Sequence, residues 1–314
     1  MGKPVHHKGR KKLKKRYIIV PLAILLVIAI GTGGLIFFYK NRNTQANDNE
    51  NSHSQVATDS VQKDEKILVR TEADAEPVYI NAIEGMPRNS YNDDGFYTDE
   101  NGFIAYKQNG KEISTVGVDV SYVQGDIDWQ AVKAAGVDFA IIRCGGRGYG
   151  EKGILYTDEK FKQNIEGATD AGLDVGVYFY SQAVSVEEAE EEAQYTLELI
   201  SDYKLKYPVV FDWEHYELDD ARTDNVDRDT LTQIALKYCD VVQKSGYTPV
   251  VYANRSLLYF EYDLAKLINT EIWLASYEDN PDYYYDFGIW QYSTEGKVDG
   301  IKSDVDLNVC MYAY

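Results

Sequence analysis

Strand signals and helix signals alternate along residues 116–314, an order that few folds accommodate. Segments rich in β-branched and aromatic residues are separated by segments of helical periodicity, which is typical of parallel strands joined by helices. Eight strands are predicted, with helices in the first five gaps between them. The predicted strands are 116–121, 139–145, 174–181, 207–214, 248–254, 271–277, 287–293 and 304–312.

Eight strands alternating with helices predict an α/β fold of the β/α-barrel type. The connections 278–286 and 294–303 are too short for a helical crossover, which needs about a dozen residues. We therefore expect a reduced barrel, with eight strands and about five helices, in which the three final strands have few helices between them. The acidic run 187–192 is expected to be the solvated face of one of these helices.

A segment of 23 uncharged residues, 17–39, precedes this domain. About 20 apolar residues span a bilayer, so the segment is long enough for a transmembrane helix. Its length and the lack of a small-residue cleavage motif argue against a cleaved signal peptide. Eight Lys and Arg between Lys3 and Arg16 favour a basic cytoplasmic tail at residues 1–16 and an extracellular body. The sequence thus predicts a single-pass protein of the cell membrane.

Residues 40–94 are rich in Asn, Asp, Glu, Ser and Gln and lack periodicity, which predicts a largely disordered extracellular linker. Residues 95–115 alternate in polarity around Asn101-Gly102 and Asn109-Gly110, two dipeptides typical of hairpin turns. A small β-meander is therefore expected directly before the barrel, which is predicted to cover residues 116–314.

The charge of the chain is unevenly distributed. The first 40 residues contain nine of the 32 Lys and Arg and no acid, so the remainder carries 23 basic against 51 acidic residues, a net charge of −28. Such a body repels nucleic acid, which is excluded as a partner. Three cysteines are too few for a disulfide framework, and we expect buried free thiols at Cys144, Cys239 and Cys310. No spacing of His, Cys or Asp indicates a metal site, and no cofactor is expected.

Four acidic residues are expected at strand ends. Asp212 and Glu214 are two residues apart at the end of the fourth strand, so their side chains face the same side, about 6–7 Å apart along the strand. A solvated strand end is the alternative for this pair alone. Asp119 ends the first strand and Asp306 begins the last, so they share one rim only if the last strand runs antiparallel to the first five. Paired carboxylates at the C-terminal rim of a barrel suit glycoside hydrolysis.

Several stretches around these acids, taken in order, resemble the glycoside hydrolase family 25 lysozymes. The matching stretches are Gly117-Val-Asp-Val-Ser121 followed by Asp128-Trp129, Phe211-Asp-Trp-Glu214, Ile289-Trp-Gln-Tyr292 and Val305-Asp-Leu-Asn308. The resemblance covers the whole predicted barrel. It implies the family's reduced barrel, in which five helices surround eight strands.

The resemblance also implies lysozyme (N-acetylmuramidase) activity, which hydrolyses the β-1,4 bond from N-acetylmuramic acid to N-acetylglucosamine in peptidoglycan. Glu214 matches the family's general acid, and Asp212 matches the carboxylate that assists the substrate's 2-acetamido group as internal nucleophile. Asp119 and Asp306 match flanking acids that orient the site and tune its charge. Clustered carboxylates shift one another's pKa values, which keeps one of them protonated.

Aromatic side chains at the barrel rim are expected to form a sugar-binding wall, because a flat apolar ring with a polar tip suits sugars. These are Tyr178, Tyr180, Tyr252, Trp273, Tyr277 and Trp290, with Gln291 beside them. Arg143 either approaches the site from the second strand or pairs with a structural acid.

Two other functions remain open for the same barrel. One is a non-catalytic wall-binding module, against which the presence of all four acids argues. The other is a structural role in an envelope assembly. The catalytic interpretation predicts two partners: peptidoglycan glycan strands, and the membrane through the N-terminal helix. It places the chain in cell-wall remodelling.

Overall fold

The structure is a computed structural model that describes residues 65–72, 75–216 and 221–314. The predicted basic tail, the predicted membrane span at 17–39 and the linker up to residue 64 lie outside these ranges. Within them, no helix is both long enough and apolar enough to cross a bilayer.

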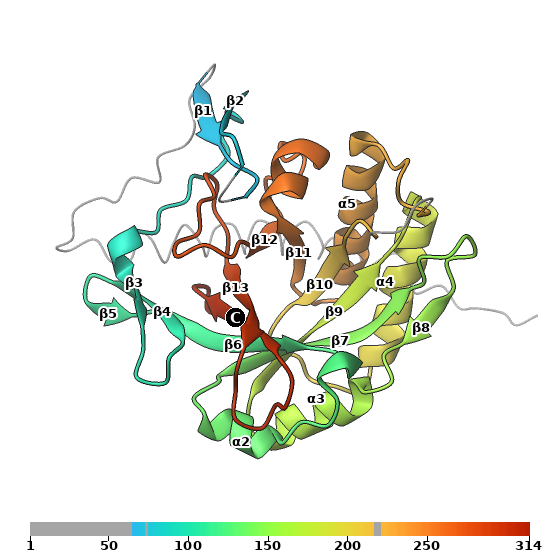
Figure 1. The fold of residues 1–314 in the computed structure, drawn as a ribbon. Helices are drawn as coiled ribbons and strands as arrows, with labels where there is room; N and C mark the ends of the chain where they lie inside the picture. Colours follow the sequence, from blue (N-terminus) through green and yellow to red (C-terminus); the bar gives the residue numbers. More distant parts are fainter. Residues whose placement is uncertain (1–64, 73–74, 217–220) are drawn as a thin grey trace, which may run out of the picture. The chain divides into compact units, whose positions relative to one another are not determined.

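Eight strands close a barrel (Figure 1). They are β6 (Thr115–Val120), β7 (Phe139–Arg147), β9 (Asp174–Ser181), β10 (Val209–Trp213), β11 (Pro249–Asn254), β12 (Glu271–Ala275), β13 (Ile289–Gly296) and β14 (Val305–Cys310). The order around the barrel is β6–β14–β13–β12–β11–β10–β9–β7, and β7 pairs with β6 to close it. A short strand, β8 (Leu155–Thr157), extends β7 as a hairpin.

The predicted barrel and its antiparallel last strand are confirmed. The first seven barrel strands, β6, β7 and β9 to β13, run parallel to one another, whereas β14 is antiparallel to both β13 and β6. The short connection from β13 to β14 leaves no room for a helical crossover, so the chain turns back as a hairpin.

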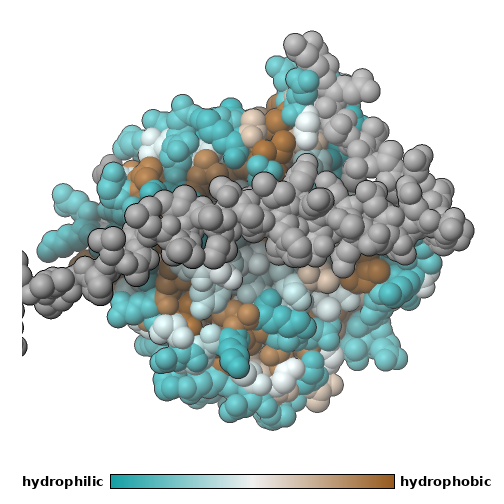
Figure 2. Space-filling model, turned by 180° about the vertical axis from the view of Figure 1, so that it is seen from behind, coloured by the Kyte–Doolittle hydropathy of each residue, from teal (hydrophilic) through white to brown (hydrophobic). Residues whose placement is uncertain are grey.

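Four α-helices and one π-helical turn lie in the five gaps where helices are predicted, on the outer side of the barrel (Figure 1). They are α2 (Trp129–Ala134), α3 (Phe161–Asp170), α4 (Val186–Ile200), α5 (Arg228–Lys244) and η3 (Leu257–Glu261). The side chains of Asp128, Ser185 and Asp227 cap α2, α4 and α5 by accepting backbone N–H groups of the first turn. Hydrophilic side chains predominate on the face in Figure 2, with hydrophobic ones in separate patches.

Alternate residues of the strands fill the barrel interior. Phe139, Ile141 and Val210 are fully buried there, and the next inward positions on the same two strands are Arg143 and Asp212. The apolar layer therefore lies beneath the polar one.

Gly117 on β6 allows the close packing of this apolar layer. A Cβ atom at this position would lie 2.2 Å from the ring of Phe139, so β6 can approach β7 here only with glycine. The ring of Phe139 also stacks on Tyr207, with centroids 4.2 Å apart.

Two small sheets precede the barrel. β1 (Lys66–Val69) and β2 (Val78–Asn81) form an antiparallel hairpin. β3 (Phe96–Thr98), β4 (Ile104–Gln108) and β5 (Lys111–Glu112) form the three-stranded antiparallel meander predicted at 95–115. The linker boundary at residue 94 requires correction, because β1 and β2 lie within the range expected to be disordered.

Contacts with the barrel explain this ordered segment. Asn89 N donates to Tyr284 O at 2.9 Å, Ile83 N donates to the Tyr285 hydroxyl at 3.0 Å, and the Tyr91 hydroxyl donates to Phe287 O at 2.8 Å. All three acceptors belong to the connection between β12 and β13. The partners lie far along the chain, so local composition does not reveal them.

Candidate active site

The structure brings the four predicted acids to one cavity at the C-terminal end of the parallel strands. The cavity has a volume of about 300 Å³. Its lining residues are Asp119, Arg143, Tyr178, Tyr180, Asp212, Glu214, Tyr252, Trp273, Tyr277, Gln291, Thr294 and Asp306. All predicted site residues except Trp290 are therefore neighbours in space.

Asp119 and Asp306 face each other because β14 is antiparallel to β6, where they are register partners. Asp119 is buried, and its Oδ2 accepts hydrogen bonds from Asn308 Nδ2 at 2.7 Å and Gln291 Nε2 at 3.0 Å. Burial raises the pKa of Asp119, and these hydrogen bonds oppose the rise. Burial and the charge of Asp119 raise the pKa of Asp306 to about 9. At neutral pH Asp306 is therefore protonated and donates a hydrogen bond to the Asp119 carboxylate.

Asp212 is the penultimate residue of β10, and Glu214 directly follows the strand. Their side chains are hydrogen-bonded to each other. Burial raises the pKa of both carboxyls, and the charge of Glu214 raises that of Asp212 further. A hydrogen bond between two carboxyls requires a proton on one of them, so the pair shares a proton in this arrangement and titrates as a unit. Asp212 Oδ1 is buried and has no hydrogen-bond partner among the described residues, so it is available to a substrate group.

Gln291 connects the aromatic wall to the acids. The hydroxyls of Tyr252 and Tyr277 both donate to Gln291 Oε1, each at 2.8 Å. This fixes the orientation of the amide, so that Nε2 points at Asp119.

Asn308 also links an aromatic residue to Asp119. Trp273 Nε1 donates to Asn308 Oδ1 at 2.8 Å, and Asn308 Nδ2 donates to Asp119. Asn308 was not among the predicted site residues. Its position two residues after Asp306 on one strand is the signal that places it on the inner face. Thr294, which was also missed, follows a register shift in β13 that breaks the simple alternation.

The predicted aromatic residues flank the acid pair. Tyr180 on β9 and Tyr252 on β11 are the register partners of Asp212 on either side, and Tyr178 lies two residues before Tyr180 on the same strand. Tyr277 is 55% exposed, which places a free ring face at the mouth of the cavity.

Trp290 requires correction as a sugar-binding residue. It is fully buried and lies outside the cavity. Its Nε1 donates to Ser276 O at 2.6 Å, and its ring packs edge-on against Phe96 of the meander, with centroids 5.2 Å apart. Neighbouring residues on a strand face opposite sides, so Gln291 inside the barrel implies Trp290 outside.

Arg143 satisfies both predicted roles. It lines the cavity, and its Nε donates to Asp158 Oδ2 at 2.7 Å. Its charge lowers the pKa of Asp212, but less than burial and Glu214 raise it.

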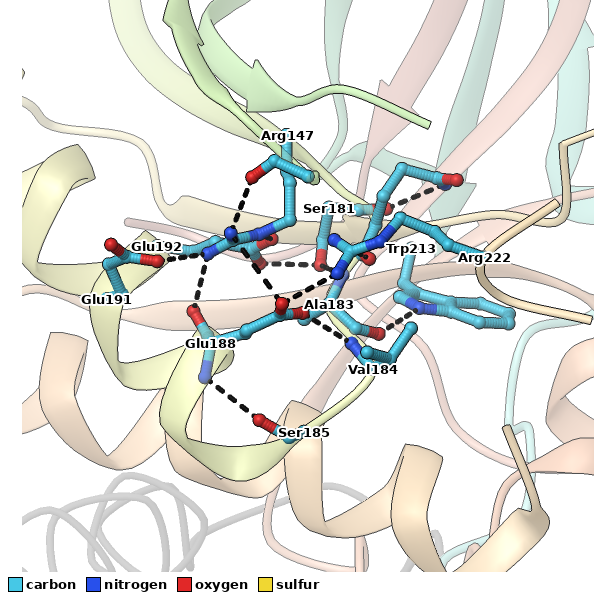
Figure 3. A network of polar contacts seen from close by, with 12 residues as sticks. Arg147, Ser181, Ala183, Val184, Ser185, Glu188, Glu191, Glu192, Trp213 and Arg222 are labelled. Atoms are coloured by element: carbon cyan, nitrogen blue, oxygen red, sulfur yellow. Dashed lines mark hydrogen bonds and ion pairs between the residues drawn. The ribbon is translucent and has the colours of Figure 1, made fainter. Parts of the chain in front are cut away.

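Arginine and glutamate side chains form a network next to Trp213, the last residue of β10 (Figure 3). Arg147 at the end of β7 donates through Nε to Glu192 Oε1 at 2.7 Å, and Arg222 donates through Nη2 to Glu188 Oε1 at 2.6 Å. Glu192 is fully buried, and burial raises its pKa to about 7. The acidic run 187–192 is therefore more than a solvated helix face, which corrects that expectation.

This network fixes the turn after β9 against Glu214. Ser181 Oγ donates to Glu192 Oε2 at 2.6 Å, and Trp213 Nε1 donates to Ala183 O at 3.0 Å (Figure 3). Gln182 Nε2 donates to the backbone oxygen of Glu214 at 2.8 Å. The backbone of the predicted general acid is thus held by a rigid neighbouring turn.

No group of three or more His, Cys, Asp or Glu side chains is arranged to hold a metal ion in the part of the chain that the structure describes. The three cysteines are buried and free.

A reduced β/α barrel with paired carboxylates and aromatic rings in one rim cavity is the architecture of a glycoside hydrolase. The comparison with known families agrees, since the model of the Glycosyl hydrolases family 25 matches residues 118–301. The chain belongs to this family.

Similar proteins include two curated lysozymes. The chain is 27% identical over 194 residues to an autolytic lysozyme of Clostridium acetobutylicum, a match that covers 61% of this chain and 54% of that protein. It is 28% identical over 207 residues to lysozyme M1 of Streptomyces globisporus, which covers 61% of this chain and 66% of that protein. The chain thus spans only part of the length of these relatives.

Two solved structures are also similar. One is the modular autolysin LytC from Streptococcus pneumoniae in complex with a synthetic peptidoglycan ligand, with a TM-score of 0.57 and 27% identity over 81% of this chain and 58% of that chain. The other is a family 25 glycosyl hydrolase from Bacillus anthracis, with a TM-score of 0.52 and 25% identity over 66% of this chain and 93% of that chain.

Replacing Asp306 by Asn should flatten the dependence of stability on pH. The folded protein keeps the Asp306 proton up to about pH 9, whereas an unfolded aspartic acid loses it near pH 4. The unfolded state therefore binds fewer protons between these values, and this group lowers the free energy of unfolding as pH rises from about 4 to about 9. Urea denaturation at pH 5 and pH 8 should give a smaller decrease for Asp306→Asn than for the wild type.

The matched control is Asp299→Asn, because Asp299 is exposed in the β13–β14 connection. Its decrease should equal that of the wild type. An equal decrease in the Asp306 variant would mean that Asp306 is already ionised in the folded state.

Proposed function

We propose that this chain is a lysozyme that cleaves the β-1,4 bond from N-acetylmuramic acid to N-acetylglucosamine in peptidoglycan. The observation that carries the proposal is the Asp212–Glu214 pair, two buried carboxyls that share a proton in an aromatic-walled cavity. The similarity to two lysozymes, and to an autolysin that binds a peptidoglycan ligand, supports this substrate class.

Glu214 acts as the general acid that protonates the leaving oxygen of the glycosidic bond. Burial raises its pKa, which favours the protonated form that this role requires. Its backbone is held by Gln182, so the carboxyl group is presented to the bond at a fixed position.

Asp212 assists the substrate's own acetamido group. Asp212 and Glu214 project from one strand end, which suits action on one region of the sugar better than attack from opposite faces. The acetamido oxygen attacks the anomeric carbon, the bond to N-acetylglucosamine breaks, and the Glu214 proton passes to the departing oxygen. Water then attacks the anomeric carbon and breaks its bond to the acetamido oxygen, and the proton that the water loses passes to the Glu214 carboxylate, which restores the acid.

The unpaired Oδ1 of Asp212 is the acceptor for the acetamido N–H. That hydrogen bond favours ionised Asp212, so the shared proton moves onto Glu214 when the sugar binds. Substrate binding itself thus places the proton on the group that must donate it.

The Asp119–Asp306 pair keeps one negative charge beside this pair. Asp119 raises the pKa of both Asp212 and Glu214 through its charge. Because Asp306 is protonated and donates to Asp119, the four carboxyls do not carry four charges at neutral pH.

Glu214→Gln should abolish hydrolysis of purified peptidoglycan by the full chain. The substitution is nearly isosteric and removes only the proton donor, which usually contributes about 10²–10⁴-fold in rate. Mass spectrometry of the wild-type digest should find new N-acetylmuramic acid reducing ends. Glu198→Gln, at an exposed position on α4, is the matched control and should keep the wild-type rate. Glucosamine ends or released peptides would refute the lysozyme proposal, and a loss below about tenfold would assign the acid to another residue.

Asp212→Asn should reduce kcat by about 10²–10³-fold, with little change in KM, because charge on the acetamido nitrogen develops only toward the transition state. Peptidoglycan de-N-acetylated at muramic acid should resist the wild-type enzyme to a similar degree. Steady-state kinetics on the two substrates measure both effects. Normal turnover of de-N-acetylated wall, or a sugar ester trapped on Asp212, would refute substrate assistance and leave the lysozyme proposal standing.

We further propose that a helix at residues 17–39 anchors the chain in the cell membrane, with the barrel outside the cell. The uncharged segment and the basic residues before it support this arrangement. The tethered enzyme would then remodel the wall at the surface of its own cell.

The full chain should sediment with membranes at high salt and enter solution in detergent, while a variant without residues 1–40 should stay soluble. External protease should reach the barrel in intact spheroplasts. A chain found in the medium, or trimmed after residue 39 by mass spectrometry, would refute the uncleaved anchor.

A further inference from the structure

Four tyrosines, three of them exposed and one partly buried, form an aromatic surface beside the cavity. They are Tyr122 in η2 (Tyr122–Gln124), Tyr149 in the β7–β8 connection, Tyr156 in β8 and Tyr216 after β10. We call this surface the tyrosine platform. None of the four lines the cavity itself.

The platform residues form one cluster. The rings of Tyr149 and Tyr216 are stacked, with centroids 4.0 Å apart and planes at 8°. A hydrogen bond with Tyr149 raises the pKa of Tyr216, and the nearby Tyr122 also raises it. Side chains from separate connections therefore meet at one end of the barrel.

The platform is continuous with the cavity. Arg143 lines the cavity, and its guanidinium carbon lies 4.9 Å from the ring centroid of Tyr122. Tyr180 also lines it, and Tyr156 and Tyr216 are among the neighbours that raise the pKa of Tyr180, after burial and the charges of Asp212 and Glu214. Arg143 Nη2 is buried and has no hydrogen-bond partner among the described residues, so a polar atom without a partner lies where the cavity meets the platform.

The rings are open to solvent on a rigid support. Tyr122 and Tyr149 are each 48% exposed, and Tyr156 is 36% exposed. The loop that carries Tyr149 is fixed at its base, since Gly148 N donates to Ile154 O at 2.9 Å and Arg147 Nη1 donates to Gly153 O at 2.7 Å. A cluster of exposed rings held in place loses little entropy when a ligand binds to it.

The cavity is too small to hold more than a short part of a glycan strand. About 300 Å³ is at the lower end of the range for ligand sites, whereas a glycan strand is a polymer that extends past any such cavity. Tyrosine rings offer flat apolar faces and hydroxyls, which match the apolar face and the hydroxyl rim of a pyranose ring. Because the body of the chain is strongly acidic, a polyanion is disfavoured as the occupant.

We propose that the tyrosine platform is a glycan subsite, which binds a sugar of the same strand next to those held in the cavity. This inference rests on the proposed lysozyme function and deepens it, because it names where the strand leaves the cavity. The platform contributes binding to long glycans and takes no part in the chemical step.

The test compares two substrates in the full chain: a tetrasaccharide of the peptidoglycan backbone and long glycan strands. Tyr149→Ala and Tyr216→Ala should each lower kcat/KM on long strands by about fivefold to tenfold, through KM, which is the size of an aromatic stacking contact. Cleavage of the tetrasaccharide should be unchanged, which also demonstrates that the variants fold. Tyr149→Phe keeps the ring and should retain most of the activity on long strands.

The matched control is Tyr79→Ala, because Tyr79 is 71% exposed on β2 and is not part of the platform. It should behave as the wild type on both substrates. Equal decreases in kcat/KM on both substrates, or no decrease in the alanine variants, would refute the proposal that the platform is a glycan subsite.

The outcome is separable from the proposed function. If the wild type cleaves neither substrate, the lysozyme proposal fails, and sedimentation with long glycan strands tests the platform alone. Binding weakened by Tyr149→Ala and not by Tyr79→Ala would support it, and equal binding by all three proteins would overturn it.

Discussion

The antiparallel pairing of β14 between β13 and β6 is the constraint on which the candidate site depends. It closes the barrel and places Asp306 opposite Asp119 at the same rim as the ends of the parallel strands. In a fully parallel barrel of this sequence, the start of the last strand would lie at the other end. The short connection before β14 therefore explains both the missing last helix and the presence of Asp306 in the site.

Clustering four carboxyls in a buried cavity opposes folding, because each loses hydration and repels the others. The structure offsets this with amide donors and shared protons. Asn308 and Gln291 donate to Asp119, and two tyrosines and a tryptophan fix the direction of these amides. The aromatic wall thus has a structural task in addition to any contact with sugar, since it holds the donors that oppose the rise in the pKa of Asp119.

The strands and the reduced barrel follow from local periodicity and gap lengths. The reversed last strand follows from the short connection before it and from the condition that Asp306 shares a rim with Asp119 and Glu214. The prediction for Trp290 was wrong because an aromatic ring alone does not indicate which face of a strand it occupies. Strand alternation places Trp290 on the face opposite Gln291. The acidic run on α4 does not reveal the burial of Glu192, because its partner Arg147 lies on strand β7, 45 residues earlier in the chain. The ordered segment before residue 94 was missed for the same reason, since its partners belong to the β12–β13 connection.

Most buried arginines pair with acids that do not belong to the catalytic cluster. Arg147 and Arg255 are nearly fully buried, and each pairs with acids that hold connections outside the cavity: Glu192 for the turn after β9, and Glu278 for the loop that carries Tyr277. Arg143 lies at the cavity, but its charge is largely neutralised by Asp158 at 2.7 Å.

Amide side chains donate to Asp119, and the acids of the cavity hydrogen-bond to one another, while the charge of Arg143 lowers the pKa of Asp212. An arginine paired directly with Asp212 or Glu214 would stabilise the ionised form and lower the pKa of that carboxyl, which would remove the proton that the reaction needs. Structural acids such as Glu192 and Glu278 pair with arginines, whereas Asp119 accepts from amides and the other three candidate catalytic acids hydrogen-bond to acids. Burial and the charge of Asp119 both raise the pKa of Glu214, which favours the protonated form that the proposed general-acid role requires.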